Sequence, residues 1–331
     1  MGSYCTVHVD AGYLLTAMAK RATGTSLRNG IEADHEVIIT ALISHATEGS
    51  GLPLLRVHWY DSARKGIPDH TQERIGLIPR VKLRLGRTGY NGEQKGVDLR
   101  MGLDLIAQAR NTAARAIYLV SGDDDLTEAV EEAQAHGVQV IVLAVRTHEG
   151  EPHGVSRNLR AAADGLDLLS TEALDAAVSP RNPAAAAAVA PTSPTPSPSL
   201  LARRAAPVPD RVGSSPAGEI RAAELTDDAV ACSSATPLGT SVRTDFLTDD
   251  ETAEIMDRIA GRVLDTWLDG SGVERRAELV TSKPSIPQDV DRALLVDLSA
   301  ALGDYDLSDS IRYKLRSLFW RKFDAMNADA P

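Results

Sequence analysis

Short apolar runs alternate with amphipathic segments over the first 170 residues. The apolar runs are 4–10, 54–60, 79–85, 116–120 and 138–144. Between them, apolar residues recur at spacings of three and four, the period of a helix, over 11–22, 34–47, 97–113 and 125–136. Strands alternating with helices predict an α/β fold in which helices cover a parallel sheet. A last helix-like piece, 156–169, is expected to close the domain.

The pattern changes after residue 175. Residues 176–244 are rich in Pro, Ala and Ser and show no sustained period, which predicts a disordered linker because such a segment cannot bury a core. This boundary leaves one α/β domain over 1–175 and a second folded segment over 245–331.

The second segment has helical periodicity. Ile255, Ile259, Val263 and Trp267 form one apolar stripe, and Leu315, Leu318, Phe319 and Phe323 form another. These stripes predict a small helical module. The last helix also carries Arg312, Lys314, Arg316, Arg321 and Lys322, so the module is a candidate contact surface for RNA or for a protein partner.

Net charge, cysteine count and the length of the apolar stretches argue against several classes of protein. The net charge of −11 argues against a protein that coats nucleic acid through bulk electrostatics, although it leaves a nuclease with metal-binding carboxylates open. Cys5 and Cys232 are the only cysteines, too few for a disulfide framework or a cysteine zinc cluster. No apolar stretch approaches the roughly 20 residues of a membrane span. A cytoplasmic location is therefore expected, and a homo-oligomer stays open.

Acidic residues follow three of the predicted strands, and another lies in the first turn of the helix before the fourth strand. They are Asp10, Asp61, the run Asp123–Asp125, and Asp98. The carboxyl ends of parallel strands share one edge of a sheet, where ligands bind. Any single Asp here could simply cap a helix. Their convergence instead favours a site for Mg²⁺ or Mn²⁺, since such cations prefer several carboxylate oxygens.

A basic strip precedes these acids. Arg80, Lys82 and Arg84 alternate with apolar residues, so a strand would place them on one face, and Arg87 and Lys95 continue the strip. Two interpretations stay open. The strip either guides a polyanion towards the acids or protects an edge strand against aggregation.

Three stretches carry a more specific signal: VHVDAGYLL from residue 7, KGVDLRMGLDLI from residue 95 and YLVSGDDDLTEAVEEAQAHGVQVIVLAV from residue 118. Together they resemble the NYN domain, a branch of the PIN-like nucleases, over about residues 4–170. The resemblance implies a three-layer α/β sandwich with a central parallel sheet. It also implies an acidic pocket that binds Mg²⁺ or Mn²⁺ for RNA hydrolysis.

Carried over by position, the resemblance makes Asp10, Asp98, Asp123 and Asp125 the metal ligands and catalytic acids. Asp104 aligns with a further family acid, but it follows Asp98 by six residues, about 600° around a helix, and so lies on another face. Asp124 occupies a variable position and is expected to be solvated. Additional candidate acids are therefore Asp61, Asp104 and Asp124.

Two positions depart from the family pattern. Tyr13 stands where Asn is common, which removes a polar group near the proposed metals, and Leu126 replaces a Phe with another apolar side chain. Candidate substrate-binding residues are Tyr13, Arg84, Arg87, Lys95 and Ser121.

The leading hypothesis is a metal-dependent ribonuclease that leaves a 5′-phosphate, the last point following from the resemblance. A catalytically inactive NYN domain that binds RNA or serves as a scaffold is the alternative. A phosphatase-like domain is a third interpretation, against which Gly12 stands where the second acid of a DxD motif would be.

Overall fold

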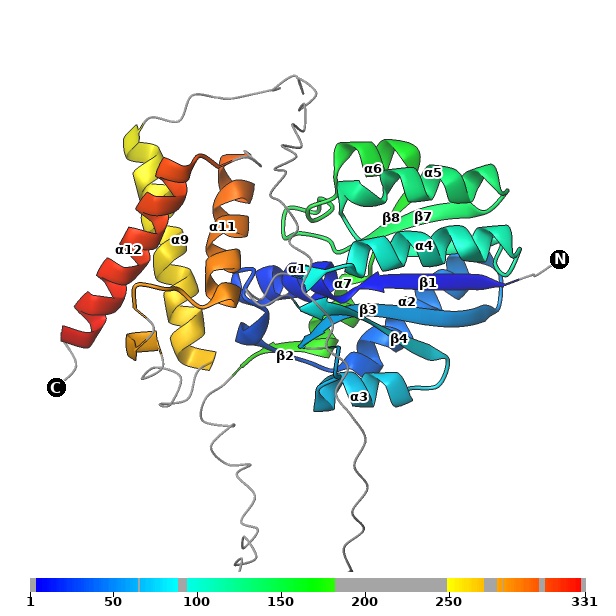
Figure 1. The fold of residues 1–331 in the computed structure, drawn as a ribbon, viewed down its shortest axis with the longest axis horizontal. Coiled ribbons are helices and arrows are strands. Elements are labelled where there is room, and N and C mark those ends of the chain that lie inside the picture. Colours follow the sequence, from blue (N-terminus) through cyan, green and yellow to red (C-terminus); the bar gives the residue numbers. More distant parts are fainter. Residues whose placement is uncertain are drawn as a thin grey trace, which may run out of the picture. The chain divides into compact units, whose positions relative to one another are not determined.

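The computed structural model describes residues 4–64, 66–88, 94–181, 249–270, 279–281, 283–303 and 307–328. Figure 1 shows a central sheet with helices in the N-terminal domain, and long helices near the C-terminus. Most of the predicted linker, 182–244, lies outside the described residues. Within the described part, no helix is long and apolar enough to span a membrane.

The sheet has the strand order β5-β4-β3-β1-β6-β7-β8 among the described residues. Every neighbouring pair is parallel except β4 with β5, which is antiparallel. The strands are β1 (Cys5–Asp10), β3 (Leu54–Arg64), β4 (Val81–Thr88), β5 (Gln94–Lys95), β6 (Ala116–Val120), β7 (Gln139–Ala144) and β8 (Gly165–Leu168). A separate antiparallel pair joins β2 (Ile31–Ala33) to β9 (Val178–Pro180).

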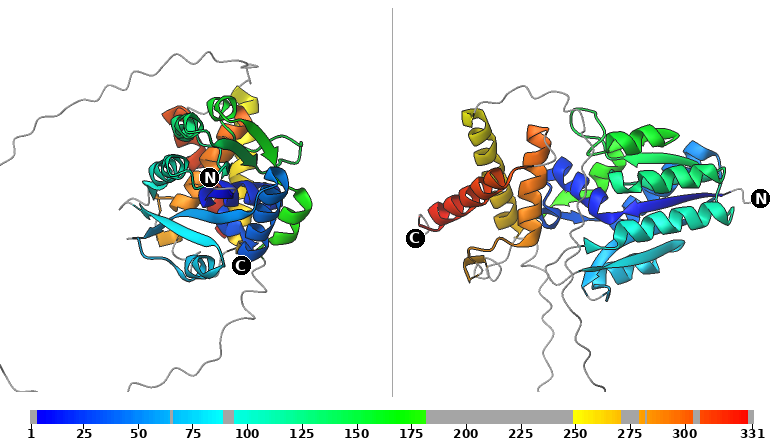
Figure 2. Two further views of the ribbon diagram at one scale, coloured as in Figure 1. Left: turned by 90° about the vertical axis from the view of Figure 1, so that its right-hand side faces the viewer. Right: turned by 45° about the horizontal axis from the view of Figure 1, so that its top comes forward.

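Helices cover both faces of the sheet, because the side chains of each strand alternate between the two faces and form a buried apolar cluster on each. One face packs against α1 (Ala11–Thr23), α2 (His35–Ser50) and α7 (Thr171–Ala177), and the other against α4 (Val97–Arg110), α5 (Thr127–Ala135) and α6 (Arg157–Ala162). Figure 2 (left) looks nearly along the strands and shows the sheet between these layers. In β1, Val7 and Val9 enter the core beneath α1 and α2. The predicted three-layer α/β sandwich with a central parallel sheet is confirmed.

Two sequence predictions need correction. The segment 156–169 is not one helix, because it divides into α6 and the edge strand β8. Asp164 causes the break: its backbone N–H donates to the carbonyl of Val140, and its side chain accepts from the Val140 N–H at 2.7 Å. In addition, β3 continues to Arg64 rather than ending near residue 60. A further helix, α3 (His70–Leu77), begins at a capping box between Asp69 and Gln72.

The C-terminal helices are α9 (Asp249–Gly270), α11 (Gln288–Leu302) and α12 (Asp309–Ala328). Val263 and Trp267 of α9 are buried with Phe319 and Phe323 of α12, so the two predicted apolar stripes form one core. The capping residue expected at Thr248 lies outside the described residues.

Buried Asp297 ties α11 to the turn that follows α1. Its side chain is only 2% exposed. It accepts hydrogen bonds from the Lys20 ammonium at 2.7 Å and from the Ser26 hydroxyl at 2.8 Å. Leu27, the next residue, is buried in the core of the C-terminal helices. The charge-assisted bonds of Asp297 and the apolar contacts of Leu27 thus join the C-terminal helices to the same turn.

Replacing Asp297 with Asn is expected to lower the free energy of unfolding by about 2–5 kcal/mol, because the amide leaves the Lys20 charge and the Ser26 donors poorly paired. Urea denaturation followed by circular dichroism measures this loss. The control is Asp324→Asn, which breaks an exposed pair with Lys283 and is expected to cost at most about 1 kcal/mol. Equal losses in the two variants would contradict the anchoring role of Asp297.

Candidate active site

Asp10 stands at the junction between β1 and α1. It is the N-cap of α1, and one carboxylate oxygen accepts a hydrogen bond from the Tyr13 backbone N–H at 3.1 Å. Burial raises the pKa of Asp10 to about 6, and the charge of Asp98 adds to this rise. The capping bond holds the carboxylate in place at the carboxyl edge of the sheet.

Asp98 reaches the same region from the first turn of α4. Burial again raises its pKa, followed by the charges of Asp123 and then Asp125, while the positive charge of Arg292 lowers it. The charge of Asp98 therefore acts on Asp10, and the acidic turn after β6 acts on Asp98. Segments far apart in the chain thus bring Asp10, Asp98 and the turn after β6 within electrostatic reach of one another.

Hydrogen bonds of 3.1–3.2 Å within the turn after β6 orient two of its three aspartates, Asp123 and Asp125. Buried Ser121 accepts from the Asp123 backbone N–H at 3.2 Å, so its hydroxyl supports the turn. Asp123 in turn accepts from the Asp125 N–H at 3.1 Å. Asp124 is exposed, as expected, and its carboxylate also accepts hydrogen bonds from Ser156 and Asn158, which join the turn to α6.

Gly122 permits a very close approach within this turn. A Cβ atom at this position would lie 1.9 Å from the carbonyl oxygen of Gly154 and 2.9 Å from a ring carbon of Tyr13. Tyr13 is fixed from its other end as well, since its hydroxyl donates to the carbonyl of His153 at 2.6 Å. Only a residue without a side chain fits between these groups.

The donor chemistry of the site suits a hard divalent cation. Asp10, Asp98 and Asp123 offer only oxygen atoms. The pKa of Asp10 is raised mainly by burial and further by the charge of Asp98, and a bound cation would offset both effects. Among the described residues, however, no three His, Cys, Asp or Glu side chains are grouped closely enough to hold an ion by themselves. Mg²⁺ is compatible with that arrangement because it keeps several waters and often binds through one or two carboxylates.

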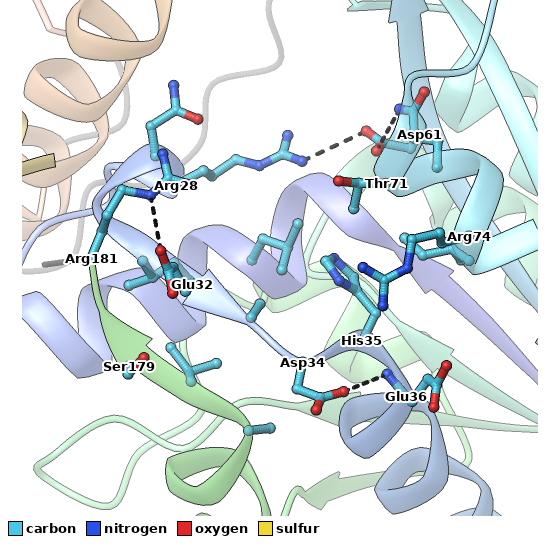
Figure 3. Close-up of a pocket in the computed structure, with 18 of the residues that line it drawn as sticks. Arg28, Glu32, Asp34, His35, Glu36, Asp61, Thr71, Arg74, Ser179 and Arg181 are labelled. Carbon is cyan, nitrogen blue, oxygen red and sulfur yellow. Dashed lines mark hydrogen bonds and ion pairs between the residues drawn. The ribbon is translucent and has the colours of Figure 1, made fainter. Parts of the chain in front are cut away.

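Asp61 lies in a different cavity. Because β3 continues to Arg64, Asp61 sits within the strand, where its carboxylate accepts a hydrogen bond from Gln72 at 2.9 Å. The Arg28 guanidinium lies 3.7 Å from it and reaches across the cavity, as Figure 3 shows. This cavity, of about 940 Å³, is not lined by Asp10, Asp98 or Asp123. Asp61 is therefore not an additional acid of the candidate site.

Asp104 and Arg84 belong to a polar network beneath α4. Asp104 accepts a hydrogen bond from the Tyr60 hydroxyl at 3.0 Å, and Arg84 Nε lies 3.2 Å from the same carboxylate. The Tyr60 hydroxyl is also 3.0 Å from Nδ1 of His8, whose pKa burial lowers to about 4. These pairings occupy both groups. They correct two expectations, an additional acid at Asp104 and a substrate contact at Arg84.

The remaining basic candidates cannot be placed in the same way. The backbones of Arg87 and Lys95 pair where β4 meets β5, but their side chains lie outside the described part of the structure. A role for either side chain stays a prediction.

A cleft of about 930 Å³ opens beside the acids. Asp10 and Asp123 line it together with Tyr13, Gly122 and Gly154. Six basic residues also line it: Lys20, Arg21, Arg146, Arg262, Arg292 and Arg312. Of these six, the sequence singles out only Arg312, as part of the basic last helix, and it does not place that residue beside the acids.

A second residue has a usable sequence signal. Lys20 follows Tyr13 by seven residues, which places both on one face of α1. Arg21 also lies in α1, Arg146 comes from the β7–α6 connection, and the other three come from the C-terminal helices, where no local spacing relates them to the acids.

Comparison with known proteins identifies the N-terminal half. The family model described as "NYN domain" matches residues 7–169, and so confirms the resemblance noted from the sequence. An uncharacterized protein of Sinorhizobium fredii, y4oD, is 36% identical over 101 residues. That match covers 30% of this chain and 47% of the relative, so the chain spans about half the length of the relative it matches. No solved structure matches.

Replacing Gly122 with Ala is expected to lower the free energy of unfolding by about 1–3 kcal/mol, because the new Cβ must displace the Gly154 backbone. Thermal unfolding measures the change. The matched control is Gly76→Ala in α3, where the nearest atom to a new Cβ lies at an ordinary 3.7 Å. That control should be neutral or stabilising by up to about 1 kcal/mol. Equal stability of the two variants would contradict the close packing at Gly122.

Proposed function

We propose that the NYN domain of this chain, residues 7–169, is a metal-dependent ribonuclease. The NYN domain is a PIN-like nuclease family, so a nuclease that takes RNA as its substrate is the general expectation for this domain. The finer proposal is that Asp10, Asp98 and Asp123, with Asp125 as a further ligand, hold Mg²⁺ or Mn²⁺ during phosphodiester hydrolysis.

The electrostatic coupling of the acids carries this proposal. The charge of Asp98 raises the cost of ionising Asp10, and the charge of Asp123 raises the cost of ionising Asp98, in both cases in addition to burial. A divalent cation relieves that repulsion and is therefore favoured there. When bound, such an ion lowers the pKa of a coordinated water and neutralises charge on the phosphate.

The chain itself supplies rigidity and substrate contacts. The capping bond from the Tyr13 N–H holds Asp10, and the Ser121 hydroxyl and the Asp125 N–H hold the turn that carries Asp123. Arg146, in the cleft that Asp10 and Asp123 line, is suited to a non-bridging phosphate oxygen. In the reaction, a water oxygen bonds to phosphorus, and the bond from phosphorus to the 3′ oxygen breaks. The products are a 3′-hydroxyl and a 5′-phosphate.

The alternative is an NYN domain that binds RNA without cleaving it. Two observations favour it. Tyr13 replaces the common Asn, and its hydroxyl is bonded to the His153 carbonyl, so it offers no free polar group towards the acids. Among the described residues, no three potential ligands form a ready-made ion site. We place either activity in the cytoplasm.

Cleavage of end-labelled single-stranded RNA by the full chain is expected in Mg²⁺ or Mn²⁺ and is expected to stop in EDTA. Asp10→Asn and Asp123→Asn should each reduce the rate by about 100-fold or more, because each removes a carboxylate from the proposed cation site. Gel analysis of the products measures the rate and the end group.

The matched control is Asp257→Asn, which makes the same change in an exposed pair with Lys322 and should cleave like the unmodified chain. Cleavage that persists in EDTA, or that survives unchanged in both Asp10→Asn and Asp123→Asn, would overturn the proposed site. RNA binding without any cleavage would instead support the alternative.

A further inference from the structure

We propose that the C-terminal helices form a phosphate-binding wall of the active-site cleft, with Arg262 of α9 and Arg292 of α11 as contacts to the RNA backbone. The substrate would then lie between these helices and the NYN domain. This inference rests on the proposed ribonuclease function for its choice of ligand, and the observations that support it are independent of the metal.

The first observation is the composition of the cleft. Its lining includes Asp10 and Asp123 from the NYN domain and Arg262 and Arg292 from the C-terminal helices. Cations from one segment therefore border the same space as acids from the other. A polyanion whose reacting phosphate rests at the acids needs positive charge beside the flanking phosphates.

The second observation concerns which basic side chains of the cleft are still available to bind a ligand. Lys20 pairs with Asp297 at 2.7 Å and Arg21 pairs with Asp175 at 2.7 Å, so the charges of these two residues already take part in ion pairs within the fold. Arg146, Arg262 and Arg292 are exposed, and no acidic side chain in the described part of the chain forms an ion pair with them. Exposed guanidinium groups without a carboxylate partner are suited to bind phosphate.

Arg292 also lies within electrostatic reach of the acids, since its charge acts on Asp98. It projects from a regular helix, and the buried Asp297 of the same helix fixes α11 against the turn after α1. Arg262 is held near that turn too, because its guanidinium contacts the carbonyl of Gly24 at 3.4 Å. Residues held on anchored helices present a defined arrangement to a ligand.

Apart from Arg312, which lines the cleft, the basic side chains of the last helix are poorer candidates for the RNA contact. Arg316 pairs with Asp291 and Lys322 pairs with Asp257, so part of its charge is already compensated. Lys314 and Arg321 line a separate cavity that contains none of the candidate acids. Arg321 is therefore a matched control, an exposed arginine of the same helical module placed away from the cleft.

The experiment measures binding separately from cleavage. A fluorescein-labelled single-stranded RNA is titrated with the full chain in EDTA, and anisotropy is read at several salt concentrations. Arg262→Ala and Arg292→Ala are each expected to weaken binding by about 5–10-fold, and each should reduce the slope of log affinity against log salt by about 1. Arg321→Ala should change the affinity less than about twofold. Thermal unfolding confirms that the variants fold alike.

The outcomes separate this inference from the proposed function. Unchanged affinity and unchanged salt slope in the Arg262 and Arg292 variants would overturn the phosphate-binding wall, even if the chain cleaves RNA. Weakened binding in both variants supports the wall, even if no cleavage is found in any metal. Tighter binding after either substitution would show that the arginine disfavours RNA in the cleft, and would also overturn the inference.

Discussion

Repulsion between carboxylates at one edge of the sheet is the constraint on which the rest of the site depends. Asp10 is partly buried, the charge of Asp98 acts on it, and the turn that carries Asp123 acts in turn on Asp98. Such a group of acids is costly unless protons, cations or arginines compensate it. The capping bond from the Tyr13 N–H lowers that cost at Asp10, and the charge of Arg292 lowers it at Asp98.

The site is built mainly from backbone interactions. Asp10 and Asp123 are each held by an N–H group a few residues further along the chain. Gly122 lets the acidic turn approach the Gly154 backbone so closely that no side chain could be accommodated. Tyr13, although it departs from the usual family residue, supports this packing through its bond to the His153 carbonyl. A rigid frame of this kind positions ligands before any cation or substrate arrives.

The sequence predicts the parallel sheet, and it predicts that Asp10 and Asp123 border one cleft, because both depend on local patterns. Buried strands are recognisable as short apolar runs, and residues after parallel strands necessarily meet at one edge. It fails for Asp61 because β3 runs past residue 60, which no local signal marks. It fails for Arg84 because that side chain pairs with Asp104 across the interior, a tertiary contact. The helical angle did separate Asp104 from Asp98 correctly.

The cleft illustrates the same limit more strongly. Arg292 and Asp10 are 282 positions apart, and nothing in either local sequence relates them. Their common cleft exists because Asp297 and Leu27 join the C-terminal helices to the turn after α1. Fold class can be predicted from periodicity, whereas the electrostatic surroundings of a site depend on which segments pack together.

The most direct test is whether the acids hold a cation. Electron paramagnetic resonance reports free Mn²⁺ during titration of the full chain, in the absence of RNA. The carboxylate cluster predicts that the unmodified chain removes Mn²⁺ from solution and that Asp10→Asn and Asp98→Asn bind it at least about tenfold more weakly. An unmodified chain that leaves Mn²⁺ free, or an Asp10→Asn variant that binds it equally well, would contradict a metal site at this edge of the sheet.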